Sequence, residues 1–160
     1  MPDSSTDLKV DIVDYPAKHL VGFKTRSNIS RSTMDCPPLW DQFIPQLKKF
    51  PGRTRNKTYG LFVMVDELIS FDFMVAVETP PDFKTPREMV VFELDAGRYA
   101  RCRVPNSAEI LMAYSTLYST WLHGQDEYDI VKKGPCFELY PPHWNPSTPF
   151  ELYVRVIPRK

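Results

Sequence analysis

GPCFELYPPHW, residues 134–144, is the stretch on which the interpretation of the whole chain depends. Aromatic and aliphatic residues follow one another between a Gly-Pro pair and a Pro-Pro pair, which is the pattern of a strand with a turn at each end. Glu138 is the exception, because it places a carboxylate in the middle of this apolar run. Successive side chains of a strand point to opposite faces, so Cys136, Glu138 and Tyr140 are predicted to share one face of a sheet.

The environment of Glu138 separates two interpretations of the sequence. If its face meets water, or if the carboxylate pairs with an arginine, the residue is an ordinary charge. If the face meets a cavity, the cavity has a negative floor and aromatic walls, which suits a large organic cation. Burying an unpaired carboxylate costs several kcal/mol or raises its pKa, and a cationic ligand can offset that cost.

Charge and length narrow the class of protein. The 160 residues include 20 Lys plus Arg and 20 Asp plus Glu, so the formal net charge is zero. Nucleic-acid binders usually have a basic excess, so we expect no direct DNA binding. The length fits a single domain over residues 1–160. Residues 1–7 are polar and no apolar run reaches the roughly 20 residues that span a bilayer, so we expect no signal peptide, no membrane segment and a cytoplasmic location.

Cysteines and histidines give no sign of a metal or disulfide site. The three cysteines are far apart in the sequence, which favours buried, reduced thiols in a cytosolic protein. The three histidines match no metal-ligand spacing. No phosphate-binding loop, zinc-protease motif or nucleophile elbow occurs, so the sequence predicts no cofactor, no metal and no assigned catalytic residue.

The spacing of apolar residues along the sequence predicts eight strands and two helices. The predicted strands cover residues 8–15, 18–29, 58–65, 71–78, 89–94, 98–104, 136–140 and 150–157. Apolar residues at helical spacing predict helices over 35–50, with Asp35 as N-cap and a kink at Pro45, and over 107–122. Residues 124–134 are expected to form a polar loop.

The order of elements repeats. Both the first half, about 8–78, and the second half, about 88–158, are predicted to run strand, strand, helix, strand, strand, with a proline-rich connector at 79–87. We therefore expect a duplicated α+β fold with pseudo-two-fold symmetry, an antiparallel sheet and two main helices flanking a central groove. Grooves of this kind bind small ligands.

Three stretches together resemble the gyrase-inhibitor-like (GyrI-like) proteins. They are YPAKHLVGF (15–23), FELY (137–140) and the closing FELYVRVIP (150–158). That superfamily includes the effector-binding domains of AraC- and MerR-type regulators. The resemblance implies a ligand groove in which Glu138 faces an aromatic pocket that attracts cationic, lipophilic compounds. Because only about seven polar residues precede the first predicted strand, we expect a stand-alone ligand-binding module without a helix-turn-helix domain.

Several aromatic residues are candidates for the pocket wall beside Glu138. Tyr140 is expected to share its face, and Trp144 is a candidate lid because it lies in a proline-flanked loop. The other candidate ligand-binding residues are Trp40, Trp121, Tyr118, Tyr59, Phe71 and Phe73. Each of those on the helices can equally be part of an ordinary core.

Three functions remain open on the sequence. The first is a binding protein for amphipathic, aromatic organic cations, such as drug-like compounds. The second is a hydrolase of small electrophilic compounds, with Glu138 as general base assisted by Tyr140, Tyr118 or Tyr99. The third is an interaction protein that inhibits a partner such as DNA gyrase. The sequence also leaves a homodimer open.

Overall fold

The structure, a computed structural model, describes residues 8–28, 30–50, 57–65, 70–131 and 134–160. Its strands are β1 (Val10–Tyr15), β2 (Lys18–Asn28), β3 (Thr58–Met64), β4 (Ser70–Glu78), β5 (Val90–Leu94), β6 (Gly97–Val104), β7 (Tyr128–Ile130), β8 (Cys136–Tyr140) and β9 (Phe150–Pro158). The helical segments are α1 (Ser32–Phe43) with the 3₁₀ helix η2 (Ile44–Lys49), and α2 (Ile110–Ser115) with the 3₁₀ turn η4 (Ser107–Glu109) before it and the π-helix η5 (Thr116–Trp121) after it.

One antiparallel sheet contains strands of both halves. Its order is β1-β6-β9-β8-β3-β4-β2-β5, and β7 pairs with β9 outside this path. When each strand of the first half is exchanged for its counterpart in the second, the same order results, read from the opposite edge of the sheet. The predicted duplication requires this symmetry. The first strand of each half completes the other half's sheet, since β1 pairs with β6 and β5 pairs with β2. The expected α+β architecture is therefore confirmed.

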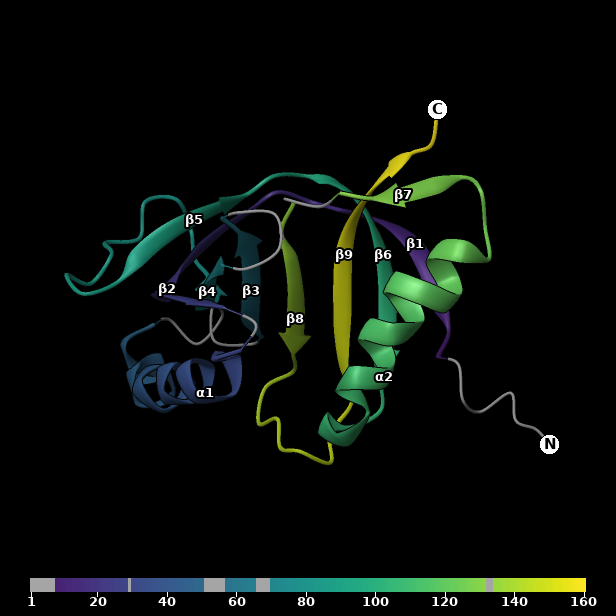
Figure 1. The fold of residues 1–160 in the computed structure, drawn as a ribbon. Coiled ribbons are helices and arrows are strands. Elements are labelled where there is room, and N and C mark those ends of the chain that lie inside the picture. Colours follow the sequence, from purple (N-terminus) through teal and green to yellow (C-terminus); the bar gives the residue numbers. More distant parts are fainter. Residues whose placement is uncertain (1–7, 29, 51–56, 66–69, 132–133) are drawn as a thin grey trace.

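The two faces of the sheet carry different cores. Both helices pack on one face: α1 covers β2 and β4, and α2 lies over β6 and β9, with β8 visible between them (Figure 1). The other face holds a tyrosine-rich cluster in which Tyr15, Tyr99 and Tyr153 surround Phe137. Because side chains alternate along β8, Phe137 lies in this cluster while Glu138 faces the helices.

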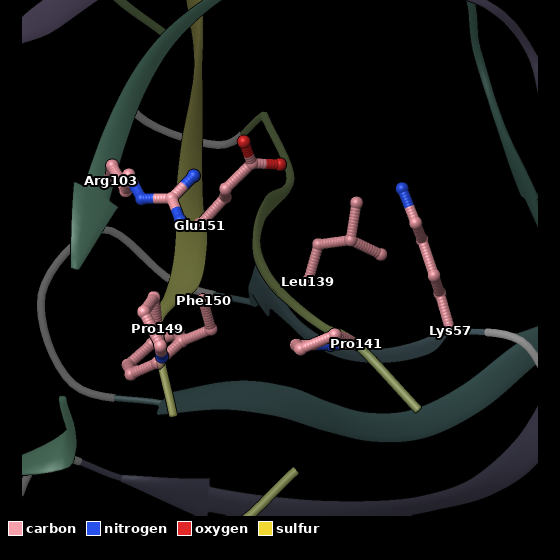
Figure 2. A pocket seen from close by; sticks show the side chains of 7 residues that line it. All are labelled: Lys57, Arg103, Leu139, Pro141, Pro149, Phe150 and Glu151. Carbon is pink, nitrogen blue, oxygen red and sulfur yellow. The ribbon is translucent and has the colours of Figure 1, made fainter. Parts of the chain in front are cut away.

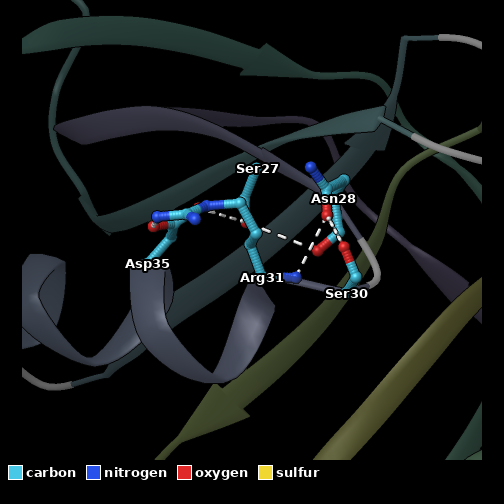
Figure 3. A network of polar contacts seen from close by, with 5 residues as sticks. All are labelled: Ser27, Asn28, Ser30, Arg31 and Asp35. Carbon is cyan, nitrogen blue, oxygen red and sulfur yellow. Dashed lines mark hydrogen bonds and ion pairs between the residues drawn. The ribbon is translucent and has the colours of Figure 1, made fainter.

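The first helix differs from its prediction at both ends. It begins at Ser32 and has Arg31 rather than Asp35 at the N-cap position. Asp35 instead accepts a hydrogen bond from the Ser27 hydroxyl at 2.9 Å and forms an ion pair with Arg31 at 3.4 Å (Figure 3). The helix ends at Phe43, and the expected break at Pro45 appears as a change to 3₁₀ geometry.

Other boundaries agree within a few residues, with one omission. The predicted polar loop 124–134 contains β7, a three-residue strand that pairs with the end of β9. The predicted strand end at position 29 lies outside the described residues. Within the described part of the chain, no helix is long and apolar enough to span a membrane.

Candidate functional site

Glu138 is buried on the helix-covered face of β8. Its side chain is 9% exposed, and Gly60 of β3 lies directly opposite in the sheet register. Tyr114 of α2 donates a hydrogen bond from its hydroxyl to Glu138 Oε2 at 2.7 Å, and the Tyr140 hydroxyl donates to Oε1. Each carboxylate oxygen thus has one tyrosine donor. The predicted alternation of this strand is confirmed.

Within residues 8–28, 30–50, 57–65, 70–131 and 134–160, no positively charged side chain pairs with this carboxylate. Among the described residues, the ion pairs involve other carboxylates and none includes Glu138. Burial raises the pKa of Glu138 above its usual value, while the hydrogen bonds from Tyr140 and Tyr114 act in the opposite direction. The partners that the described residues offer this buried acidic group are therefore two tyrosine hydroxyls.

Trp40 forms the wall of the site on the α1 side. The centroid of its indole lies 5.2 Å from that of the Tyr140 ring, in an edge-to-face arrangement, and 6.4 Å from that of the Phe73 ring. A β-carbon at Gly60 would come within 3.2 Å of Trp40 Cζ2. The absence of a side chain at this position is what lets the indole lie against the sheet beside Glu138.

The opposite wall comes from α2 and its π-helical continuation. Tyr114 and Tyr118 stack with ring centroids 6.4 Å apart, and Tyr118 is 43% exposed at the edge of the site. On the same face of β8 as Glu138, burial and then the Glu138 charge raise the thiol pKa of Cys136 to about 12. These contacts bring a second aromatic surface to the carboxylate.

The loop after β8 brings Trp144 to the Tyr140 side of the site. The ring centroids of Trp144 and Tyr140 lie 4.8 Å apart. The indole N–H of Trp144 donates a hydrogen bond to the Thr148 carbonyl oxygen at 2.8 Å. The Phe150 ring stacks on the Tyr140 ring with centroids 4.7 Å apart, and it also meets the Trp144 ring edge to face at 5.8 Å. Tyr140 is therefore held between Trp144, Phe150 and Trp40 while its hydroxyl reaches Glu138.

Some predicted site residues lie elsewhere. Tyr59 belongs to the tyrosine-rich cluster on the opposite face, where its hydroxyl bonds Tyr15 at 2.6 Å, because it is one residue out of phase with Gly60. Tyr99, proposed as a catalytic partner, is fully buried in that same cluster. Phe71 packs on Phe62 beneath α1.

Trp121 packs with the core beneath α2. In the described part of the chain, no ring contact joins its indole to the tyrosines around Glu138. Tyr59 and Tyr99 therefore lie on the face of the sheet opposite to Glu138, whereas Phe71 and Trp121 pack in the cores beneath the two helices.

Two contributors were missed as site residues. Tyr114 is absent from the predicted ligand-binding residues, although its spacing of four from Tyr118 places both on one helix stripe. Cys36 lies four residues before Trp40 on α1, and its thiol pKa is raised to about 11 by burial and then by the negative charge of Glu138. Helix rotation relative to the sheet decides both contacts, and no local pattern fixes that rotation.

The described residues contain no group of three or more His, Cys, Asp and Glu that could hold a metal ion. One surface hollow lies near the ends of β6, β8 and β9 and another beside the β1–β2 and β5–β6 turns, and Glu138 lines neither of them. The hydroxyls of Tyr114 and Tyr140 contact the carboxylate itself, and the Trp40 ring packs edge to face on the Tyr140 ring.

A family model places the chain among known proteins. The model for Cass2, described as an integron-associated effector binding protein, matches residues 11–156. The chain belongs to the Cass2 family. The matched region includes all of the sheet except the ends of β1 and β9, and it contains every residue of the Glu138 site named above. No curated protein sequence matches the chain significantly.

Solved structures agree with this assignment at the level of the fold. The integron cassette protein VCH_CASS2 from Vibrio cholerae superposes with a TM-score of 0.70 at 15% identity, covering 92% of this chain and 95% of that chain. SAV2435, whose structure contains bound tetraphenylphosphonium, gives 0.71 at 17% identity, with 94% of each chain covered. The C-terminal domain of EcmrR gives 0.64 at 14% identity, covering 94% of this chain and 98% of that domain. The resemblance to GyrI-like proteins is thereby confirmed.

Proposed function

We propose that this effector-binding protein binds lipophilic, aromatic organic cations at Glu138. The observation that supports the proposal most strongly is a carboxylate 9% exposed, with aromatic rings around it and no ion-pair partner among the described residues. Such a charge is costly to bury alone, and a cation placed beside it would offset the cost. The tetraphenylphosphonium bound by SAV2435 is a compound of this chemical class.

The walls of the site suit a delocalised or quaternary cation. Tyr140, Trp40, Tyr114 and Tyr118 offer ring faces and edges, and cations gain about 0.5–2 kcal/mol from each well-placed aromatic ring. Both carboxylate oxygens of Glu138 already accept a tyrosine hydroxyl. A ligand without hydrogen-bond donors can therefore interact with the carboxylate through charge while the tyrosine bonds remain.

Ligand entry requires the rings that cover Glu138 to move. Trp40 is half-buried on α1, Tyr118 is exposed and Trp144 lies in the β8–β9 loop, so these three are the side chains that we expect to move when a ligand enters. In this proposal the aromatic side chains act both as cover in the free protein and as walls around the ligand.

Titration calorimetry with a charged and an uncharged ligand of similar shape tests the proposal. Tetraphenylphosphonium and neutral triphenylphosphine oxide are titrated into the wild type, Glu138→Gln and the exposed control Glu127→Gln. We expect Glu138→Gln to weaken tetraphenylphosphonium binding by about tenfold or more and to change the neutral ligand little. Equal losses for the two ligands would mean that the carboxylate charge does not select cations.

A hydrolytic activity is the second candidate, and one feature favours it. Glu138 combines a raised pKa with the hydroxyls of Tyr114 and Tyr140, so a general base and two proton donors meet at one place. Turnover of a strained-ring electrophile that is lost in Glu138→Gln but kept in Glu127→Gln would support it. Absence of turnover by a wild type that binds tetraphenylphosphonium would leave binding as the function.

A further inference from the structure

A surface hollow lies outside the Glu138 site, across the ends of four neighbouring strands. It has a volume of about 200 Å³ and is lined by Lys57, Arg103, Leu139, Pro141, Pro149, Phe150 and Glu151. Leu139 and Phe150 are almost fully buried and form an apolar floor with the two prolines. Lys57 and Arg103 project from opposite sides, with Leu139 between them in the view of Figure 2.

The charges around this hollow are unbalanced in favour of cations. Arg98 and Arg101 on β6 each bind an aspartate of β1 at 3.1 Å. Arg103 lies beyond the last β1–β6 pair, Val10 with Cys102, and the β1 side continues with Lys9 instead of a carboxylate. In the part of the chain that the structure describes, neither Arg103 nor Lys57 forms an ion pair.

Glu151 is the one carboxylate that lines the hollow. Its Oε1 accepts a hydrogen bond from the Tyr153 hydroxyl at 2.8 Å, so this oxygen is turned toward the tyrosine-rich cluster. The charged side chains that line the hollow are thus two cations, Lys57 and Arg103, and one anion, Glu151. A ligand placed between Lys57 and Arg103 therefore meets a net positive charge above an apolar floor.

We infer that this hollow binds a compact amphipathic anion, such as a single-ring carboxylate. The charge of Lys57 and Arg103 selects an anion, and the floor of Leu139 and Phe150 selects an apolar body. The volume is below the roughly 300–1,000 Å³ of drug-sized sites, which limits the occupant to about one ring or a short chain. The site goes beyond the proposed cation site and does not depend on it.

Benzoate followed by amide chemical shifts in NMR is the direct test on the full chain. We expect saturable shifts at the amides of Arg103, Leu139 and Glu151. Neutral benzyl alcohol and inorganic phosphate, which lack the charge and the apolar body respectively, should bind clearly more weakly at equal ionic strength. Phosphate or benzyl alcohol binding as well as benzoate would overturn the amphipathic assignment.

Charge variants give effects of opposite sign. The double variant Lys57→Gln/Arg103→Gln should weaken benzoate binding by about tenfold or more, while the matched exposed pair Lys84→Gln/Arg87→Gln leaves it unchanged. Glu151→Gln should strengthen binding because it removes the opposing charge. Glu138→Gln should have no effect, which separates this site from the proposed cation site. No saturable benzoate shift, or equal affinity in the two double variants, would overturn the inference.

Discussion

At the scale of single residues, Glu138 is the group whose protonation links stability to function. Burial raises its pKa above the ordinary value of 4.5, so the folded state holds the proton of this group more tightly than the unfolded state does. The contribution of this group to folding is then complete below its unfolded pKa and is lost as the pH rises through the folded pKa. The free protein is less stable at neutral pH because it keeps this acid buried.

Replacing Glu138 by its neutral isostere should therefore stabilise the free protein at neutral pH. We expect Glu138→Gln to raise the free energy of unfolding at pH 7, with the gain shrinking as the pH falls toward 4.5. Chemical denaturation at several pH values measures this, with Glu127→Gln as the exposed control. A glutamine variant less stable than the wild type throughout this range would contradict the direction of the pKa shift.

Gly60 controls the position of Trp40 beside the carboxylate. A β-carbon 3.2 Å from the indole is too close, so Gly60→Ala should move the ring outward by a few tenths of an ångström. We expect a loss of about 1–3 kcal/mol in the free energy of unfolding and a shift in tryptophan emission. The same substitution in a Trp40→Leu background should cost less. An equal cost in both backgrounds would show that Gly60 does not position Trp40.

At the scale of elements, α1 is fastened to β2 by the polar network of Figure 3. Asn28 accepts from the Ser30 hydroxyl at 2.7 Å and from the Arg31 amide at 3.0 Å, while Asp35 accepts from Ser27. This network fixes the start of the helix that carries Trp40. It therefore contributes to the geometry of the Glu138 site from a distance.

Asp35→Asn should loosen this attachment in a pH-dependent way. The hydrogen bond from Ser27, and then that from Arg31, hold the pKa of Asp35 below its usual 3.8. Its contribution is thus present above pH 3.8 and is lost as the pH falls through the folded pKa. We expect a lower Tm at pH 7 than for Asp41→Asn, an exposed position on the same helix. The difference should fade in acid, and a difference that persists there would contradict this account.

The sequence predicted local periodicity well and tertiary placement poorly. The alternation in 136–140 placed Glu138 and Tyr140 on one face, because strand geometry alone sets that relation. Tyr59 was assigned to the wrong face because sheet register, not composition, decides its partners. The start of α1 was misplaced because the N-cap preference of Asp35 is overridden by its contact with Ser27. β7 has only three residues and exists through its pairing with β9.

At the scale of the whole molecule, the exchange of strands ties the halves together. β1 completes the second half and β5 completes the first, while β3 and β8 pair along the centre. The Glu138 site lies at this central junction, with α1 from one half and α2 from the other. A site of this kind needs both halves, so we interpret the chain as one domain.

A fragment containing residues 8–78 should therefore fail to fold alone. It lacks β6, which pairs with β1, and β8, which pairs with β3. We expect little protection of its amides from hydrogen exchange, and recovery of protection when residues 88–158 are added. The intact chain should unfold in one transition. Native-like protection in the isolated fragment would show that the halves are independent.

The central claim is that the negative charge of Glu138 attracts the ligand. The pH dependence of tetraphenylphosphonium affinity, measured for the wild type and Glu138→Gln, tests it most directly. Because Glu138 must lose its proton to attract a cation, the wild-type affinity should fall as the pH decreases through the raised pKa of this group, above 4.5. The glutamine variant should bind weakly and show no such fall, whereas parallel pH profiles for the two proteins would contradict the claim.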